Sequence, residues 1–530
     1  MSLIAGLAQA QTKPLVVFVQ DNSLRMASVT NPGAEGLGQL ASIFTAMGAR
    51  TVLLGLNQPF PADTQLIVLV GPEREVSGEA LARIWSSLEE GSSFLLALDP
   101  PGQEGNTDTE GGGVDRLLSS EYGVNLLDGL LVNPGFTNQT IGDPSRTMVT
   151  AQADALPNPI TAPLATYNLP VFLWGARNLR AETLGLDGSA TPLLDSSPEY
   201  AETDDRVFRD TDPDPLELNI GVDYQGKLVV ATSAENVVNH SRIAVLGDSQ
   251  IFENGFGLKI DPATQTPRYP GDYVLVQRLA SWLLRQPETS WPSLPDNMTW
   301  INLDGSGGDW PSFAHATNNP NNGASVMQVR AFRNSAYLYL LIETAQPPDP
   351  DSHLTIEVDS NSDGQVDRKI TIDAHSASYM ATNGTAVPLP DAVLAVGQTI
   401  EARIPLRATG PIAQVDNLCL SNGSLTSNAA SDCLQSIGVY HSAQQDPAYL
   451  RLTGNMLGTV NGPRGANVRA TPDATGQILA VAPPGDLFAV LGRNEDGTWV
   501  EVENGPSSGW ISALTITLSG DLQLLPIVQP

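Results

Sequence analysis

The chain has 530 residues, of which 41% are hydrophobic and 6% aromatic, so it can build several cores and is not a disordered protein. Its formal net charge of −31 at pH 7 repels phosphate backbones and anionic lipid. This charge argues against a nucleic-acid partner and against peripheral membrane binding. At roughly 150 residues per domain, the length predicts three or four units.

Residues 1–13 are expected to be the remnant of an export signal or a membrane anchor. The apolar run Leu3–Ala10 ends in Ala8-Gln9-Ala10, the small-x-small pattern that precedes a signal-peptidase cut. An ordinary leader is the alternative. No later segment approaches the roughly 20 apolar residues that span a bilayer, so no membrane insertion of the chain as given is expected.

Between residues 14 and 286, short apolar runs alternate with helical stretches. The clearest runs are PLVVFVQ (14–20), TVLLGL (51–56), QLIVLVG (65–71), FLLALD (94–99), VFLWGA (171–176), KLVVAT (227–232) and RIAVLGD (242–248). Continuous apolar strands separated by helices are typical of a parallel sheet that is covered on both faces. We therefore expect an α/β domain with a doubly wound parallel sheet.

The helical period disappears after a linker at 287–296, which carries three prolines. Residues 297–450 contain alternating or apolar runs of strand length, which predict a β-sandwich. Residues 456–518 form a third, smaller all-β unit with Gly, Asn and Asp turns, and residues 519–530 are a tail. The predicted fold class is thus a multidomain α/β plus all-β protein.

One motif in the first unit suggests an enzyme. Gly247-Asp248-Ser249 follows an apolar strand, as does the nucleophile block of GDSL-type esterases. A serine nucleophile needs a histidine base, but His240 precedes the block and no Asp-x-x-His follows it within the unit. Residues 14–286 also contain no cysteine nucleophile. We expect a structural turn, no catalytic residue and no enzymatic activity.

An acidic loop in the second unit matches the first nine positions of a calcium loop, with glycine at the sixth. Its predicted metal ligands are Asp359, Asn361, Asp363, Gln365 and Asp367. Position 12 is Ile370 instead of the usual bidentate glutamate, and the flanks resemble strands rather than helices. A hairpin turn without metal is the alternative. We expect one structural Ca²⁺ ion.

The two cysteines, Cys419 and Cys433, lie in one Ser/Asn-rich stretch. Their spacing permits a disulfide that closes a small loop. Two unpaired thiols are the alternative, and the pair by itself does not establish an oxidising compartment.

Four segments of the first unit carry a resemblance: LIVLVGPEREVSGEALARIWSSLEEGSSFLLALDP (66–100), TPLLDSSPEYAETD (191–204), RIAVLGDSQIFENG (242–255) and the closing LASWLLRQ. They are similar to the extracytoplasmic domain of gliding-motility-type ABC-transporter auxiliary proteins. The resemblance implies a non-catalytic fold of the glutamine-amidotransferase type. The membrane helices usual at the ends of that family are not found in this sequence.

The second unit resembles family 9 carbohydrate-binding modules and their DOMON-like relatives. The matching segments are LDGSGGDWPSF (303–313), AYLYLLIET (336–344), the acidic loop and IEARIPL (400–406). The resemblance implies a structural calcium and aromatic faces that stack on sugar rings. Trp300, Trp310 and Tyr379 are the candidates, with packing in the core or at its rim as the alternative.

The third unit is similar to bacterial SH3-like domains. Asn467-Val468-Arg469, Gly485, Gly492-Arg493, Trp499 and Gly509-Trp510 fall at that family's characteristic places. Glycines would turn the strands of a small barrel, and tryptophans would fill or edge its core. The resemblance implies binding to the cell wall or to peptides, outside the cytoplasm.

These patterns predict an exported, non-catalytic binding or scaffold protein, extracellular or on the cell surface. Its expected partners are a cell-wall glycan or peptide, or other envelope proteins. One alternative is the extracytoplasmic accessory subunit of an ABC-type transporter. Another, of a different class, is a serine hydrolase that uses Ser249.

Overall fold

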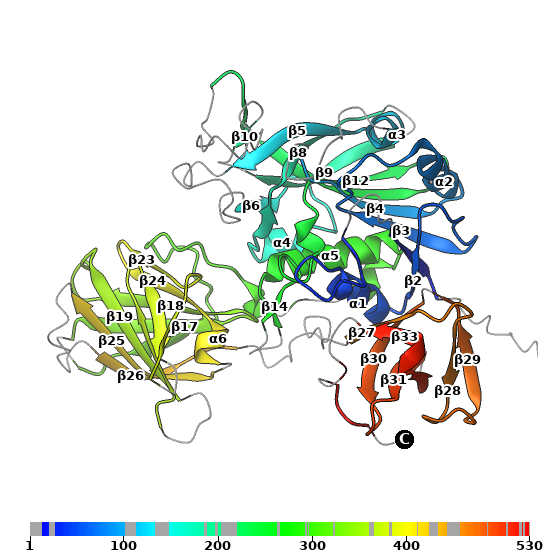
Figure 1. The fold of residues 1–530 in the computed structure, drawn as a ribbon. Helices are drawn as coiled ribbons and strands as arrows, with labels where there is room; N and C mark the ends of the chain where they lie inside the picture. Colours follow the sequence, from blue (N-terminus) through cyan, green and yellow to red (C-terminus); the bar gives the residue numbers. More distant parts are fainter. Residues whose placement is uncertain are drawn as a thin grey trace, which may run out of the picture.

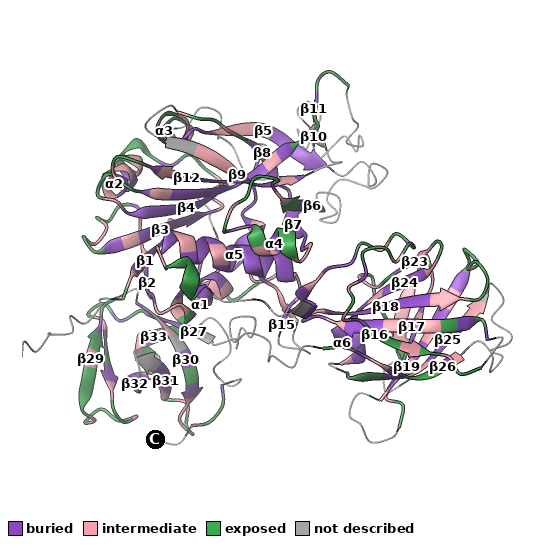
Figure 2. Ribbon diagram, turned by 180° about the vertical axis from the view of Figure 1, so that it is seen from behind, coloured by how far each residue is buried: buried purple, intermediate pink, exposed green. Residues whose placement is uncertain are grey.

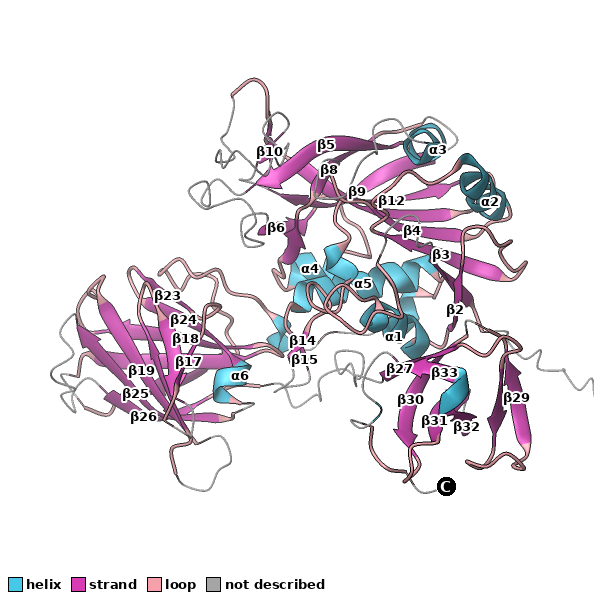
Figure 3. Ribbon diagram, in the orientation of Figure 1, coloured by secondary structure: helices cyan, strands magenta, loops and turns pink. Residues whose placement is uncertain are grey.

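The computed structural model describes residues 13–20, 27–100, 113–132, 148–184, 188–196, 200–202, 220–261, 266–291, 294, 296–321, 324–359, 365–380, 384–410, 412–422, 433–441, 456–484, 486–504, 507–518, 522 and 525–528. The predicted signal or anchor segment lies outside these residues. The described part consists mostly of β-strands, gathered in several sheets, with few helices (Figure 3).

Five neighbouring strands of a 13-stranded sheet are parallel, in the order β2–β1–β3–β4–β13. They are β1 (Leu15–Val19), β2 (Arg50–Leu54), β3 (Thr64–Val70), β4 (Ser93–Ala97) and β13 (Arg242–Leu246). Every residue of β1 and β4 is buried. Their continuous apolar sequences follow from this burial on both faces.

The other strands of this sheet pair antiparallel. They are β5 (Val124–Val132), β6 (Met148–Ala153), β7 (Val171–Trp174), β8 (Arg177–Ala181), β9 (Gly188–Ser196), β10 (Tyr200–Glu202), β11 (Tyr224–Gln225) and β12 (Leu228–Asn236). The predicted doubly wound parallel sheet is therefore wrong, and the sheet is mixed. Apolar runs report burial and not strand direction, and the short turn at 237–241 makes β12 and β13 antiparallel neighbours.

Helices cover the parallel strands on both faces. Residues Ile67 and Leu69 of β3 share a core with α2 (Gly78–Glu89) and α3 (Gly113–Tyr122). The alternate β3 residues face a second core, which contains α1 (Gly38–Ala46), α4 (Ala162–Thr166) and α5 (Pro270–Leu283). Most of α5 is buried beneath the sheet (Figure 2), which explains why its sequence is apolar nearly all round.

Two antiparallel sheets pack face to face in the middle of the chain (Figure 1). The first has β16 (His315–Asn318), β17 (Val326–Arg333), β18 (Tyr337–Thr344), β24 (Ile400–Pro405) and β23 (Val393–Val396). The second has β22 (Ala386–Pro388), β21 (Ala377–Met380), β20 (Arg368–Ile372), β19 (Ser352–Val358), β25 (Gln414–Asn422) and β26 (Cys433–Gly438). The short helix α6 (Leu406–Thr409) follows β24.

The first two units are joined by a continuous core rather than by a bare linker. Trp300 packs edge-on against Phe172 of β7 at 5.8 Å and against Tyr337 of β18 at 5.5 Å. The hairpin of β14 (Ile260–Asp261) and β15 (Thr266–Pro267) adds a polar contact, since Thr266 Oγ1 donates to Ser335 O at 2.7 Å. One hydrophobic cluster therefore runs from the mixed sheet into the middle unit.

The C-terminal unit is a single seven-stranded antiparallel sheet around a small core. In spatial order it has β29 (Ile478–Ala482), β28 (Ala466–Arg469), β32 (Ser507–Ser512), β31 (Trp499–Asn504), β30 (Leu487–Arg493), β27 (Met456–Val460) and β33 (Ile516–Leu518). A 3-10 turn at Ala513–Thr515 leads into β33. The unit lies against β2, where Arg50 forms an ion pair with Asp486 at 3.8 Å.

Candidate functional sites

The turn Gly247–Ser249 lies at the carboxyl end of the parallel strands, directly after β13. Ser249 Oγ donates a hydrogen bond to Asp99 Oδ2 at 2.6 Å, and Ser249 N–H donates to Asp99 Oδ1 at 2.7 Å. Asp248 Oδ2 accepts the backbone N–H of Trp174 at 2.7 Å. The side chains of Asp248 and Ser249 thus form hydrogen bonds within the protein, with the Trp174 backbone and the Asp99 carboxylate.

His240 and Ser249, the residues considered for the alternative serine hydrolase, lie at opposite ends of β13. His240 is in the turn before β13, and Ser249 follows this five-residue strand. Five residues of strand span roughly 17 Å, whereas a serine and its base must lie within about 3 Å. His240 therefore cannot serve as the base for Ser249 in this geometry.

Buried acidic side chains surround the same turn. Burial raises the pKa of Asp99 and Asp248, and it raises the pKa of Glu253 to about 8, with added repulsion from Asp99. Arg177 is fully buried beside them, and its guanidinium forms an ion pair with Asp128 at 3.2 Å. Among the described residues, no three His, Cys, Asp or Glu side chains are placed to hold a metal ion.

A buried carboxylate organises the glycine-rich loop of the middle unit. Glu401 on β24 accepts the backbone N–H groups of Asp304 and Gly305 at 2.9 and 2.6 Å. Its other oxygen accepts Nε1–H of Trp310 at 2.6 Å. Gly305 has a φ of +77°, and a Cβ there would lie 2.6 Å from the backbone nitrogen of Gly397. The loop is thus fixed by Glu401, a residue not selected from the sequence.

The three aromatic candidates differ in exposure. Trp300 and Trp310 are only 7% and 8% exposed, so neither offers a face on which a sugar could stack, and both are packing residues. The guanidinium of Arg403 covers the Trp300 ring at 4.3 Å. Tyr379 is half-buried at the rim of the second sheet, with Arg368 over its ring at 5.2 Å.

The described residues cover only part of the predicted calcium loop. Asn361 and Asp363 lie outside them, whereas Asp359, Gln365 and Asp367 are described. The Asp359 N–H donates to the carboxylate of Asp416 on the neighbouring strand β25. The fold therefore brings one more carboxylate to the start of this loop, from 57 residues away in the sequence.

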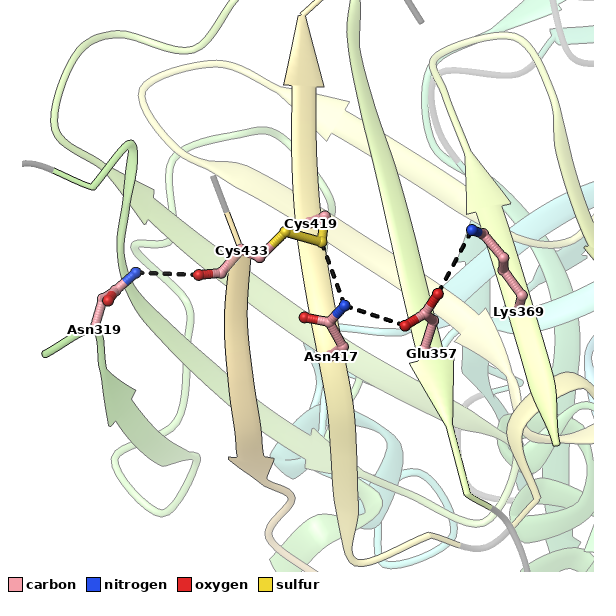
Figure 4. Close-up of a disulfide and its surroundings, with 6 residues drawn as sticks. All are labelled: Asn319, Glu357, Lys369, Asn417, Cys419 and Cys433. Atoms are coloured by element: carbon pink, nitrogen blue, oxygen red, sulfur yellow. Dashed lines mark hydrogen bonds and ion pairs between the residues drawn. A yellow bond between two sulfur atoms is a disulfide. The ribbon is translucent and has the colours of Figure 1, made fainter. Parts of the chain in front are cut away.

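A disulfide joins Cys419 of β25 to Cys433 of β26, which are directly opposite each other with Cα atoms 4.1 Å apart (Figure 4). Asn417, two residues before Cys419, donates to Glu357 at 3.1 Å, and Glu357 also forms an ion pair with Lys369 at 3.5 Å. The disulfide and the two polar contacts link four neighbouring strands of the second sheet, β26, β25, β19 and β20.

The C-terminal sheet exposes apolar side chains along one edge strand. Ile478, Leu479 and Val481 of β29 are 48%, 42% and 65% exposed. β29 pairs with β28 alone among the described strands, so its other edge is open. Trp510 is buried and Trp499 is half-buried, consistent with one tryptophan that fills the core and one at its edge.

Residues 464–517 match the bacterial SH3 domain family, so the C-terminal unit is a bacterial SH3 domain. No curated protein matches the chain. None of the helices in the described ranges is long and apolar enough to cross a membrane.

Solved structures give only weak likenesses. The N-terminal domain of mmIFT52 shares 14% identity over 51% of this chain and 97% of its own, with a TM-score of 0.35. A β-galactosidase from Bacillus circulans sp. alkalophilus shares 11% over 73% of this chain and 41% of its own, with a TM-score of 0.28. A catalytic mutant of Gan42B, a GH42 β-galactosidase from G. stearothermophilus, shares 10% identity over 74% of this chain and 40% of its own, with a TM-score of 0.28. These values establish neither fold nor function for this chain.

Proposed function

We propose that this chain is an exported, non-catalytic binding protein that attaches to the bacterial cell wall through its C-terminal SH3 domain. The observation that carries the proposal is the match of residues 464–517 to the bacterial SH3 domain family. Domains of this family commonly bind peptidoglycan. The first two units would then be held at the wall as a rigid pair, because they share a continuous core.

We assign the wall peptide to the open edge of β29. An unpaired strand edge offers backbone N–H and C=O groups to an extended peptide, and alternate side chains select it. Ile478 and Val481 supply exposed apolar contacts on this strand. Such clustered exposure on an edge strand is typical of an interaction site.

Sedimentation of the full chain with purified insoluble peptidoglycan tests this assignment. We expect the wild type to pellet with the sacculi, and a double variant, Ile478→Ser with Val481→Ser, to lose most of this binding. Val238→Ser is the matched control, since Val238 is 74% exposed in a turn of the first unit. A wild type that stays in the supernatant contradicts wall attachment, and equal pelleting of the double variant contradicts the β29 assignment.

The non-catalytic part of the proposal is supported by the geometry of Ser249. Its hydroxyl is bound to Asp99, and His240 lies at the far end of β13. We expect no labelling of the protein by a fluorophosphonate probe in intact-mass analysis. An adduct that disappears in Ser249→Ala would instead establish a serine hydrolase.

Two finer parts of the proposal rest on the sequence resemblances. Tyr379 remains the aromatic candidate for a glycan on the middle unit, and the 359–367 loop the candidate for Ca²⁺. The transporter-accessory role is the alternative for the first unit. A neighbouring transporter gene would favour this alternative over a free-standing wall protein.

A further inference from the structure

A pocket of about 320 Å³ lies between α1 and α5, on the face of the mixed sheet opposite α2 and α3. Its volume falls at the lower end of small-molecule sites, which span roughly 300–1,000 Å³. It is lined by Ile43, Ala46, Met47, Tyr273, Gln277, Ser281, Gln286 and Ser290. The pocket is therefore large enough for one small organic molecule.

Three polar residues of α5 line this pocket at a spacing of four residues: Tyr273, Gln277 and Ser281. Residues i, i+4 and i+8 lie on one face of a helix. All three are buried, at 1%, 4% and 0% exposure, on a helix whose other buried side chains are mostly apolar. Each buried polar group on such a helix needs a hydrogen-bond partner, either from the fold or from an occupant of the pocket.

The Ser281 hydroxyl carries the inference. It is fully buried, and it makes no hydrogen bond within the described part of the chain. Leaving a buried hydroxyl unsatisfied costs about 1–3 kcal/mol, so a group from outside the fold is expected to bind it. Because Ser281 lines the pocket, this group would be supplied by the pocket's occupant.

The lining residues also define the occupant's chemistry. None of them is charged, so an ion would lose its hydration without a counter-charge. Ile43 and Met47 contribute apolar side chains to the same lining as the Ser281 hydroxyl and the Gln277 amide. We propose that this pocket binds a small uncharged molecule with an apolar body and a hydroxyl or amide group directed at Ser281. This site is independent of the wall-binding surface on β29.

Four probes of similar size separate charge from shape: benzyl alcohol and benzamide, which are neutral, benzoate, an anion, and benzylamine, a cation at pH 7. Ligand-detected NMR on the full chain should show binding of the neutral pair at millimolar concentration and not of the charged pair. Ser281→Ala should weaken benzyl alcohol roughly fivefold through loss of one hydrogen bond. This variant should fold, because it removes a buried hydroxyl without a partner.

A pocket-filling variant locates the binding. Ala46 is exposed at the rim of the pocket, so Ala46→Phe places a ring over it and should abolish binding of the neutral probes. Ala82→Phe is the matched control, since Ala82 is an exposed alanine of α2 on the other face of the sheet. The proposal is overturned if no neutral probe binds, if the charged probes bind equally well, or if Ala46→Phe changes nothing.

Discussion

The indole Nε1–H of Trp310 donates a 2.6 Å hydrogen bond to Glu401 Oε1, and both side chains are buried. The two residues are 91 positions apart in the sequence. Through this bond and two backbone N–H groups, Glu401 of β24 holds the glycine-rich loop 303–310 of the middle unit in place. A tryptophan that the sequence offered as a sugar platform is therefore part of the scaffold.

Glu401→Leu should destabilise the middle unit strongly. It leaves three N–H donors without an acceptor, and two of them, those of Gly305 and Trp310, are buried. Each buried donor left unsatisfied costs about 1–3 kcal/mol. We expect a loss of at least about 2 kcal/mol, measured as a lower calorimetric melting temperature. Glu343→Leu is the control, since Glu343 is part of an exposed pair with Arg330. Equal effects of both changes would show that the loop does not depend on Glu401.

Trp300→Ala should separate the unfolding of the first two units. Its ring contacts Phe172 on one side and Tyr337 on the other, and removal of a buried tryptophan costs about 3–5 kcal/mol. Scanning calorimetry should show one transition for the wild-type pair and two for the variant. A single, merely lowered transition would mean that the two units remain coupled without Trp300.

The first unit should be more stable in acid than in weak base. Burial raises the pKa of Glu253 from 4.5 to about 8, so the folded state holds a proton that the unfolded chain releases. The contribution of protonated Glu253 to the free energy of unfolding is fully present below pH 4.5. It is lost as the pH rises towards 8, by at most roughly 5 kcal/mol. Urea unfolding at pH 5 and pH 8 measures the difference.

Glu253→Gln identifies the residue responsible, because a glutamine cannot ionise. The variant should reduce the loss of stability between pH 5 and pH 8, whereas Glu79→Gln, at an exposed position of α2, should not. An unchanged pH dependence in Glu253→Gln would assign the effect to the other buried carboxylates.

Calcium should raise the melting temperature of the middle unit. We expect a dissociation constant of about 10⁻⁴–10⁻³ M. Free Ca²⁺ at about one hundred times this constant stabilises the folded unit by about 2.7 kcal/mol. Calorimetry with and without chelator measures this shift, and Asp363→Ala should abolish it. Asp351→Ala, at an exposed position outside the loop, should keep it. Identical melting with and without chelator would leave the loop as a turn without metal.

Reduction of the Cys419–Cys433 disulfide should destabilise the second sheet. The two residues are 14 positions apart, and closing a loop of this length is worth about 3 kcal/mol in the chain-entropy model. Peptide mass spectrometry without reduction should find the two cysteines linked. The double variant Cys419→Ser with Cys433→Ser should melt at the temperature of the reduced wild type. Two freely alkylated thiols in the purified protein would contradict the bond.

The sequence alone determined the features that depend on local pattern. Apolar runs such as 65–71 and 94–99 identified buried strands, because continuous burial on both faces requires continuous apolar sequence. The spacing of Asn467-Val468-Arg469 and Gly509-Trp510 identified the bacterial SH3 domain. Each of these signals lies within one element or one small domain.

Only the tertiary structure decided which distant residues meet. Ser249 binds Asp99 across 150 residues, and Trp310 binds Glu401 across 91, so no local pattern could reveal either partner. Strand direction in the mixed sheet was equally hidden, because an apolar run records burial without recording the neighbouring strand. The polar row of Gln277 and Ser281 is visible in the sequence of α5, but only the packing of α1 against α5 places it in a pocket.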